Sequence, residues 1–328
     1  MASRSERHIQ FFDLVIKAYS RKEEFQNFDG LTPPSALNLF KAIEATHKKG
    51  RIIIPIAKGY KSVYFQDIKI SKEYATLLIN LSDRDAADPA FSDPVAGSRR
   101  FARRQKEEGV EGSAHVIIKF HPGRPDTYSL VLESTPGLPS SRIQKFLNLY
   151  LRKAKTYFPE KFVCDDPSGT RDKNGAFKKI PINVRILLLG QPSDQLTNDI
   201  NNGTLSGIEI ISPQVSKTNW DERGFVKDKL LTTTLDISEL KLHKSIKNWP
   251  ILKQIFKTAE DKATGVRIKF KTLSGVSRSI VIDPRSSDSV KDDAYIKKEI
   301  LDNFNHPLES AYDEVHSELA TRMYNCVK

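Results

Sequence analysis

The sequence predicts an α+β protein with mixed or antiparallel sheets, helical N- and C-terminal segments and two domains. Short runs rich in β-branched and aromatic residues, separated by turn residues, recur along the chain and indicate strands. Apolar residues at helical spacing mark both ends of the chain. The 328 residues exceed the usual size of one domain, and a hydrophobic fraction of 38% is ordinary for a globular protein.

The first half is predicted to open with helices and to continue as antiparallel strands. The apolar spacing indicates an amphipathic helix over 9–19, and Ser35 is well placed to cap a second helix that follows it. A turn rich in Pro and Gly at 122–125 predicts a hairpin, and Ser140 or Ser141 is the predicted cap of the helix over 140–154. The predicted strands cover 52–56, 63–70, 74–81, 115–121 and 127–133.

The domain boundary is predicted inside 165–178, where Asp, Gly, Pro, Asn and Lys leave little to bury, so this segment is the expected linker. The N-terminal α+β domain then covers 1–164 and is completed by C-terminal helices within 290–328. The second α+β domain covers 179–289 and opens with 180–189, which is apolar enough for the centre of a sheet. Its other predicted elements are strands at 205–211 and 230–237, a helix at 249–262 and a hairpin of 266–271 with 277–283. Helices are expected at 294–304 and 307–327.

The positive charge of the chain is unevenly distributed. The sequence has 52 Lys and Arg against 41 Asp and Glu, a net charge of +11, and nine basic residues against two acidic ones give 241–271 a net charge of +7. Strand alternation places Arg267, Lys269 and Lys271 on one face, while Lys253 and Lys257 lie four apart on the preceding helix. We expect these five residues to form a basic ridge that contacts phosphates, with a merely solvated hairpin and helix as the alternative.

A second basic block occupies 97–106, where five residues are basic and none is acidic: Arg99, Arg100, Arg103, Arg104 and Lys106. Arginine pairs bidentately with phosphate, so the block is a second candidate for nucleic-acid contact. Because glutamates follow at 107, 108 and 111, a self-neutralising surface helix is the alternative.

Known base-reading motifs and catalytic motifs are absent from the sequence. It has no zinc-finger spacing, basic zipper or paired aromatic signature of an RNA-binding sheet, so backbone contacts with little sequence preference are expected. We expect no catalytic residue, no metal site and no cofactor. The aspartates between 83 and 93 fit turns better than a calcium loop, and Glu239-Leu240-Lys241 supports a metal-dependent nuclease only weakly.

The compartment is predicted to be the cytoplasm. Apolar runs are far shorter than the roughly 18 residues of a membrane span, and the N-terminal MASRSERHIQ lacks the regions of a signal peptide. Cys164 and Cys326 are far apart in the sequence and are expected to be free thiols.

Three segments resemble the RexA family of phage-exclusion proteins of lambdoid prophages. They are VIIKFHPGRPDTYSLVLESTPGLPSSRIQKFLN at 116–148, SIKNWPILKQIFKTAEDKATGVRIKFKTLSGVSRSIVID at 245–283, and the end of the C-terminal helix with Arg322, Met323 and Tyr324. The likeness lies in hydrophobic pattern, turn placement and element order over 60–328. The chain before residue 50 and the block at 97–106 have no match in it.

The resemblance implies a non-enzymatic, two-domain homodimer that binds double-stranded DNA with little sequence preference and acts in abortive infection, beside a membrane effector protein encoded nearby. With the charge pattern, it leads us to expect a DNA-binding sensor of anti-phage defence. A metal-dependent nuclease, or a scaffold whose basic face meets an acidic protein, are the alternatives.

Overall fold

The computed structural model describes residues 3–20, 31–121, 127–213, 230–238, 247–259, 262–282, 284 and 295–327. The chain forms two compact units: unit 1 comprises Met1–Leu188 and Glu299–Lys328, and unit 2 comprises Leu189–Lys298. The predicted α+β class is confirmed, because helices accompany antiparallel sheets. The boundary lies after Leu188, so the segment 165–178, expected as the linker, belongs to unit 1.

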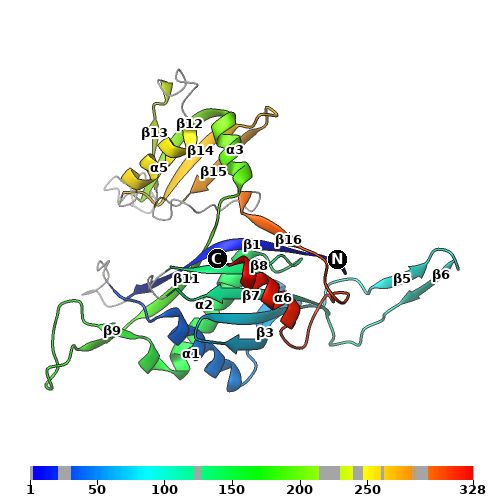
Figure 1. The fold of residues 1–328 in the computed structure, drawn as a ribbon. Helices are drawn as coiled ribbons and strands as arrows, with labels where there is room; N and C mark the ends of the chain where they lie inside the picture. Colours follow the sequence, from blue (N-terminus) through cyan, green and yellow to red (C-terminus); the bar gives the residue numbers. More distant parts are fainter. Residues whose placement is uncertain are drawn as a thin grey trace, which may run out of the picture. The chain divides into compact units, whose positions relative to one another are not determined.

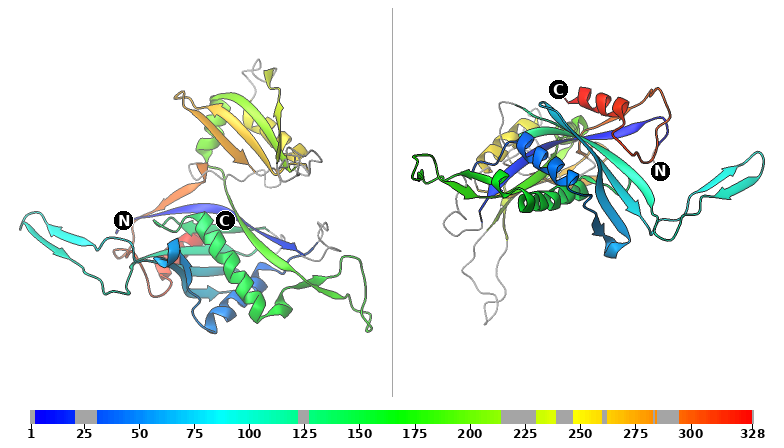
Figure 2. Two further views of the ribbon diagram at one scale, coloured as in Figure 1. Left: turned by 180° about the vertical axis from the view of Figure 1, so that it is seen from behind. Right: turned by 90° about the horizontal axis from the view of Figure 1, so that it is seen from below.

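Unit 1 is built on one large sheet with the strand order β11-β1-β8-β7-β4-β3-β2, and β16 also pairs with β1. Helices α1 and α2 cover one face and α6 covers the other (Figures 1 and 2). The strands are β1 (Arg7–Tyr19), β2 (Ile54–Ile56), β3 (Lys61–Ile70), β4 (Tyr74–Asp83), β7 (Val110–Lys119), β8 (Thr127–Glu133), β11 (Asn183–Gly190) and β16 (Lys298–Leu301); the helices are α1 (Ala36–Lys48), α2 (Ser140–Tyr157) and α6 (Ser317–Cys326), with single 3-10 turns at Ala57–Gly59 and Pro159–Lys161.

Strand β1 replaces the amphipathic helix predicted over 9–19. Because both faces of the sheet are covered, β1 buries residues that point in both directions, among them Phe11, Phe12 and Leu14. Apolar residues therefore occur at both odd and even positions of this strand. Their spacing resembled that of one face of a helix, although the strand is buried on both faces. Its register with β8 runs from Ile9↔Glu133 to Val15↔Thr127.

The predicted strands β2, β3, β4, β7 and β8 and the Ser35 cap of α1 are confirmed. The 122–125 turn lies outside the described residues, although β7 and β8 pair as a hairpin requires. The prediction that Ser140 or Ser141 caps α2 was wrong: Pro139 holds the N-cap position and no side chain caps this helix. The position predicted for the strand over 180–189 was also wrong, since β11 lies at the end of the strand order rather than at its centre.

The C-terminal segment is mostly extended, in contrast to the helices predicted over 294–304 and 307–327. β16 occupies part of the first range, and only Ser317–Cys326 of the second is helical. The chain before α6 instead gives its backbone groups to the sheet: the Ser113 amide donates to the Ser310 carbonyl at 2.9 Å, and the Tyr312 amide donates to Ser113 Oγ at 3.0 Å. These partners favour an extended conformation over a helix. We call residues 302–316, between β16 and α6, the C-terminal strap.

Unit 2 is a two-layer structure in which helices cover one face of a four-stranded antiparallel sheet of order β13-β12-β14-β15. Leu196, Ile200, Leu252 and Phe256 of the helices pack against the apolar face of the sheet. The helix α3 was not predicted, because its sequence is rich in Asn and Asp. The elements are α3 (Asp194–Asn202), β12 (Thr204–Pro213), β13 (Leu230–Leu235), α5 (Asn248–Ala259), β14 (Gly265–Lys271) and β15 (Ser277–Ile282), so the predicted second hairpin is confirmed.

Two narrow ribbons project from opposite ends of unit 1 (Figures 1 and 2). The first is built on β5 (Ala90–Asp93) and β6 (Ser98–Phe101) and the second on β9 (Val163–Asp165) and β10 (Lys179–Pro181). We call residues 86–106 the first arm and residues 163–181 the second arm. The loop or surface helix expected near 97–106 and the linker expected at 165–178 are thus both β-ribbons.

Candidate nucleic-acid interface

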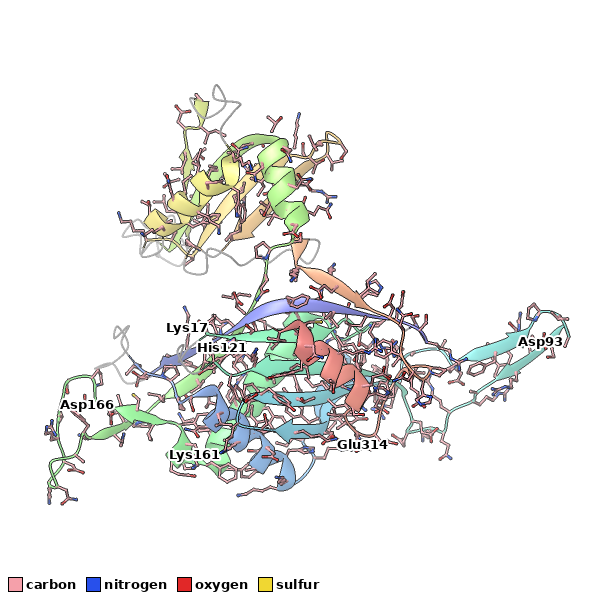
Figure 3. The ribbon with its side chains drawn as sticks, viewed as in Figure 1. Lys17, Asp93, His121, Lys161, Asp166 and Glu314 are labelled. Carbon is pink, nitrogen blue, oxygen red and sulfur yellow. The ribbon has the colours of Figure 1, made fainter. Side chains whose placement is uncertain are left out.

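The first arm is a largely exposed ribbon. Its strands pair in the register Phe91↔Arg100 and Ser92↔Arg99, and every residue of 89–103 is exposed. The carboxylate of Asp93, at the far end of the arm (Figure 3), accepts the amides of Val95 and Ala96 at 2.9 and 3.1 Å. The Asp93 carboxylate therefore stabilises the turn through these hydrogen bonds, as is usual for Asp in tight turns.

Most of the cations on the first arm have no acidic partner. Arg104 pairs with Asp88 at 3.0 Å and is tied down. The guanidinium of Arg100 lies 4.4 Å from the ring centroid of Phe91, whose side chain is 49% exposed. Among the described residues no carboxylate lies within ion-pair distance of four exposed cations: Arg99, Arg100, Arg103 and Lys106.

The glutamates that follow the arm do not neutralise it. Glu107 pairs with Arg84 at 2.9 Å, and Glu108 accepts the Gln105 amide at 2.7 Å. Glu111 accepts the Tyr64 hydroxyl; burial and this hydrogen bond raise the pKa of Tyr64 to about 12. The surface helix that the sequence left open is wrong, because this segment belongs to a β-ribbon, and the glutamates bind partners other than the cations of the arm.

The basic stripe of unit 2 lies on the face of its sheet opposite to α3 and α5, as strand alternation predicted. Arg267, Lys269 and Lys271 point away from the buried face. However, Glu209 of β12 stands directly opposite Arg267 and binds it at 2.6 Å; Lys269 contacts the second oxygen of the same carboxylate. Hydrogen bonds from Lys269 and Arg267 lower the pKa of Glu209, so two cations of the stripe are already paired.

The second part of the predicted ridge is separate from the stripe. Lys253 and Lys257 are exposed on α5, which covers the apolar face of the sheet. The sheet thus lies between them and Arg267, Lys269 and Lys271, so the single ridge predicted from the sequence is wrong. Lys241 and Lys244, which add to the +7 of this segment, lie outside the described residues.

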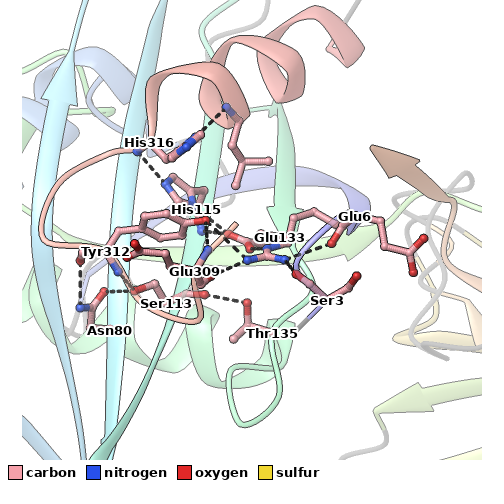
Figure 4. A network of polar contacts seen from close by, with 12 residues as sticks. Ser3, Glu6, Asn80, Ser113, His115, Glu133, Thr135, Glu309, Tyr312 and His316 are labelled. Atoms are coloured by element: carbon pink, nitrogen blue, oxygen red, sulfur yellow. Dashed lines mark hydrogen bonds and ion pairs between the residues drawn. The ribbon is translucent and has the colours of Figure 1, made fainter. Parts of the chain in front are cut away.

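A buried polar cluster in unit 1 was not predicted (Figure 4). The cluster joins Arg7, His115 and Glu133, which are 3%, 0% and 2% exposed. Glu133 accepts Arg7 Nε at 2.6 Å and contacts His115 Nδ1 at 2.7 Å. His115 Nε2 accepts the backbone amide of His316 at 3.1 Å, so both ring nitrogens are used.

Because its three side chains are almost completely buried and bind one another, this cluster stabilises the fold of unit 1. Its sequence signal was weak because Arg7, Glu133 and His316 are far apart in the chain. The pairing of β1 with β8 brings Arg7 to Glu133, and the hydrogen bond of its amide to His115 brings His316 to the cluster.

The described residues contain neither a cluster of metal-binding side chains nor a disulfide. Within them, no three His, Cys, Asp or Glu side chains are arranged to hold a metal ion. Asp83, part of the aspartate-rich stretch, pairs with Lys61 at 2.6 Å. Cys164 and Cys326 form no disulfide, as predicted, and Glu239-Leu240-Lys241 lies outside the described residues.

Comparison with protein families, curated proteins and solved structures finds no match to this chain. No helix of the described residues is long and apolar enough to cross a membrane.

Proposed function

We propose that this protein binds double-stranded DNA with little sequence specificity, and that the first arm is its main contact. The observation that carries the proposal is the exposure of four unpaired cations on a ribbon that projects from the body of unit 1. Such a ribbon is narrow enough to follow a groove of the duplex, and β-ribbons are an established way of entering one.

The chemistry of the arm favours phosphate contact over base reading. Arginine forms bidentate hydrogen bonds with phosphate oxygens, and the Phe91 ring holds the Arg100 side chain in place before any ligand binds. A side chain that is already ordered loses less conformational entropy on binding. The basic stripe of unit 2 is a secondary contact in this proposal, because Glu209 occupies Arg267 and Lys269.

The biological role that we propose is sensing of DNA in anti-phage defence within the cytoplasm, by a homodimer acting with a membrane effector protein. The resemblance to the RexA family supports this role, and the exposed cations supply the contact with DNA that it requires.

Salt dependence tests the proposed binding. With the four cations Arg99, Arg100, Arg103 and Lys106 on phosphates, the logarithm of the association constant is expected to fall with the logarithm of salt concentration with a slope of about −4, or steeper if other cations take part. Fluorescence anisotropy of labelled duplexes of unrelated sequence between low and physiological salt measures this slope.

Two duplexes of different sequence should give the same slope and similar affinity, because phosphate contacts carry no sequence information. No binding at low salt, or a strong preference for one sequence, would contradict the proposed function.

A further inference from the structure

The second arm, which the sequence suggested was a linker, repeats the construction of the first. In each arm an arginine and a phenylalanine stand directly opposite each other across the ribbon: Phe91↔Arg100 in the first arm and Arg171↔Phe177 in the second. In each case the guanidinium lies 4.4 Å from the ring centroid. Phe177 is 45% exposed, close to the exposure of Phe91.

The acidic side chains of the second arm bind other groups of the same arm, as in the first arm. The Asp172 carboxylate accepts the amides of Asn174 and Ala176 at 2.8 and 3.0 Å. Asp166, labelled in Figure 3, accepts the amide and hydroxyl of Ser168, and these hydrogen bonds lower its pKa. Asp165 pairs with Lys179 at 2.5 Å.

The remaining cations of the second arm are exposed, although the Arg171 guanidinium also donates a hydrogen bond to the Gly175 carbonyl at 2.6 Å. Every residue of 168–179 is exposed. Among the described residues, no carboxylate lies within ion-pair distance of Arg171, Lys173 or Lys178. Two arms on one unit thus show exposed cations, a stacked arginine and neutralised or turn-bound acids.

We infer that the second arm is a second phosphate-binding site for the same duplex, so that unit 1 holds DNA at two separated points. This inference rests on the proposed function. The arms project from opposite ends of the unit 1 sheet, and β1, with 13 residues, runs between those ends (Figures 1 and 2). At about 3.3 Å per residue β1 spans about 40 Å, which equals about 12 base pairs at about 3.4 Å each.

Duplex length separates two-point binding from a general loss of charge. A duplex of about 8 base pairs is too short to reach both arms, whereas one of about 30 base pairs reaches both. The test compares Arg171→Gln/Lys173→Gln/Lys178→Gln with the unchanged protein on both duplexes. The control is Lys145→Gln/Arg152→Gln/Lys153→Gln, which removes the same number of exposed charges from α2.

On the long duplex the second-arm variant is expected to bind about tenfold more weakly, with a salt slope shallower by about 2 to 3. On the short duplex it should differ from the unchanged protein by no more than about twofold, because either arm then binds alone. Circular dichroism should show unchanged folding, since the altered side chains are exposed.

If the unchanged protein binds the long duplex but the second-arm variant matches the α2 control, two-point binding is wrong and the proposed function stands. If the unchanged protein binds neither duplex at low salt, both the inference and the proposed function fail.

Discussion

Replacing Arg99, Arg100 and Arg103 with glutamate is expected to weaken duplex binding by more than about 100-fold near physiological salt. If the first arm binds DNA as we propose, the change removes three phosphate contacts and adds three negative charges beside the phosphates. Because 89–103 is entirely exposed, the variant should retain the stability of the unchanged protein. Anisotropy titrations measure the binding, and thermal unfolding checks the fold.

Two matched variants, each with three cations replaced by glutamine, show whether the first arm is the main contact. On the first arm the variant is Arg99→Gln/Arg100→Gln/Arg103→Gln, and its counterpart lies on unit 2. Arg267→Gln/Lys269→Gln/Lys271→Gln removes three cations, two of which are already paired with Glu209. We expect a loss of no more than about threefold, because a paired cation offers less attraction to phosphate. A loss in the unit 2 variant as large as that in the first-arm variant, or larger, would contradict the first arm as the main contact.

Sequence patterns predicted structure well where one face of an element is buried and the other is exposed. In β14, Val266, Ile268 and Phe270 are buried and the cations between them are not, as a period of two requires. The Ser35 cap and the amphipathic α2 likewise follow from local chemistry. These features depend on neighbours within a few residues.

The errors come from information that only the fold contains. The apolar residues of β1 do not alternate, because α6 and α2 lie on opposite faces of the sheet that it joins. Turn-forming residues at 165–178 suit a linker and a hairpin equally well. The pairing of Glu209 with Arg267 depends on the register of two strands more than 50 residues apart in the chain.

The same reason explains what was missed about the site. The two basic segments of unit 2 are neighbours in sequence, yet one lies on the helix covering the sheet and the other on the opposite face. Conversely, the two arms are far apart in sequence and share one construction that becomes visible only when Arg171 and Phe177 are seen to face each other.

Replacing Glu133 with glutamine is expected to destabilise unit 1 by about 3 to 5 kcal/mol, the usual effect of breaking a buried ion pair from one side. The variant leaves the Arg7 guanidinium buried without its carboxylate and removes an acceptor for His115. Since His115 in turn accepts the His316 amide, the strap before α6 should loosen first. Urea unfolding gives the free energy, and hydrogen exchange at the His316 amide reports the strap.

Acid should reduce the difference in unfolding free energy between the unchanged protein and Glu133→Gln. Burial opposes ionisation of Glu133, but hydrogen bonds from His115 and the positive charge of Arg7 hold its pKa below the ordinary value of 4.5. A lowered pKa in the folded state means that the carboxylate stabilises the fold above pH 4.5, and that this contribution is lost as the pH falls through the lowered value. The advantage of the unchanged protein over Glu133→Gln should therefore shrink below pH 4.5.

Glu318→Gln is the control, because it breaks a half-buried i, i+4 pair with Arg322 on α6. Exposed or partly exposed pairs of this kind contribute less than about 1 kcal/mol. An equally small loss for Glu133→Gln would mean that the fold accommodates an unpaired Arg7, and that the cluster does not hold the C-terminal strap to the sheet.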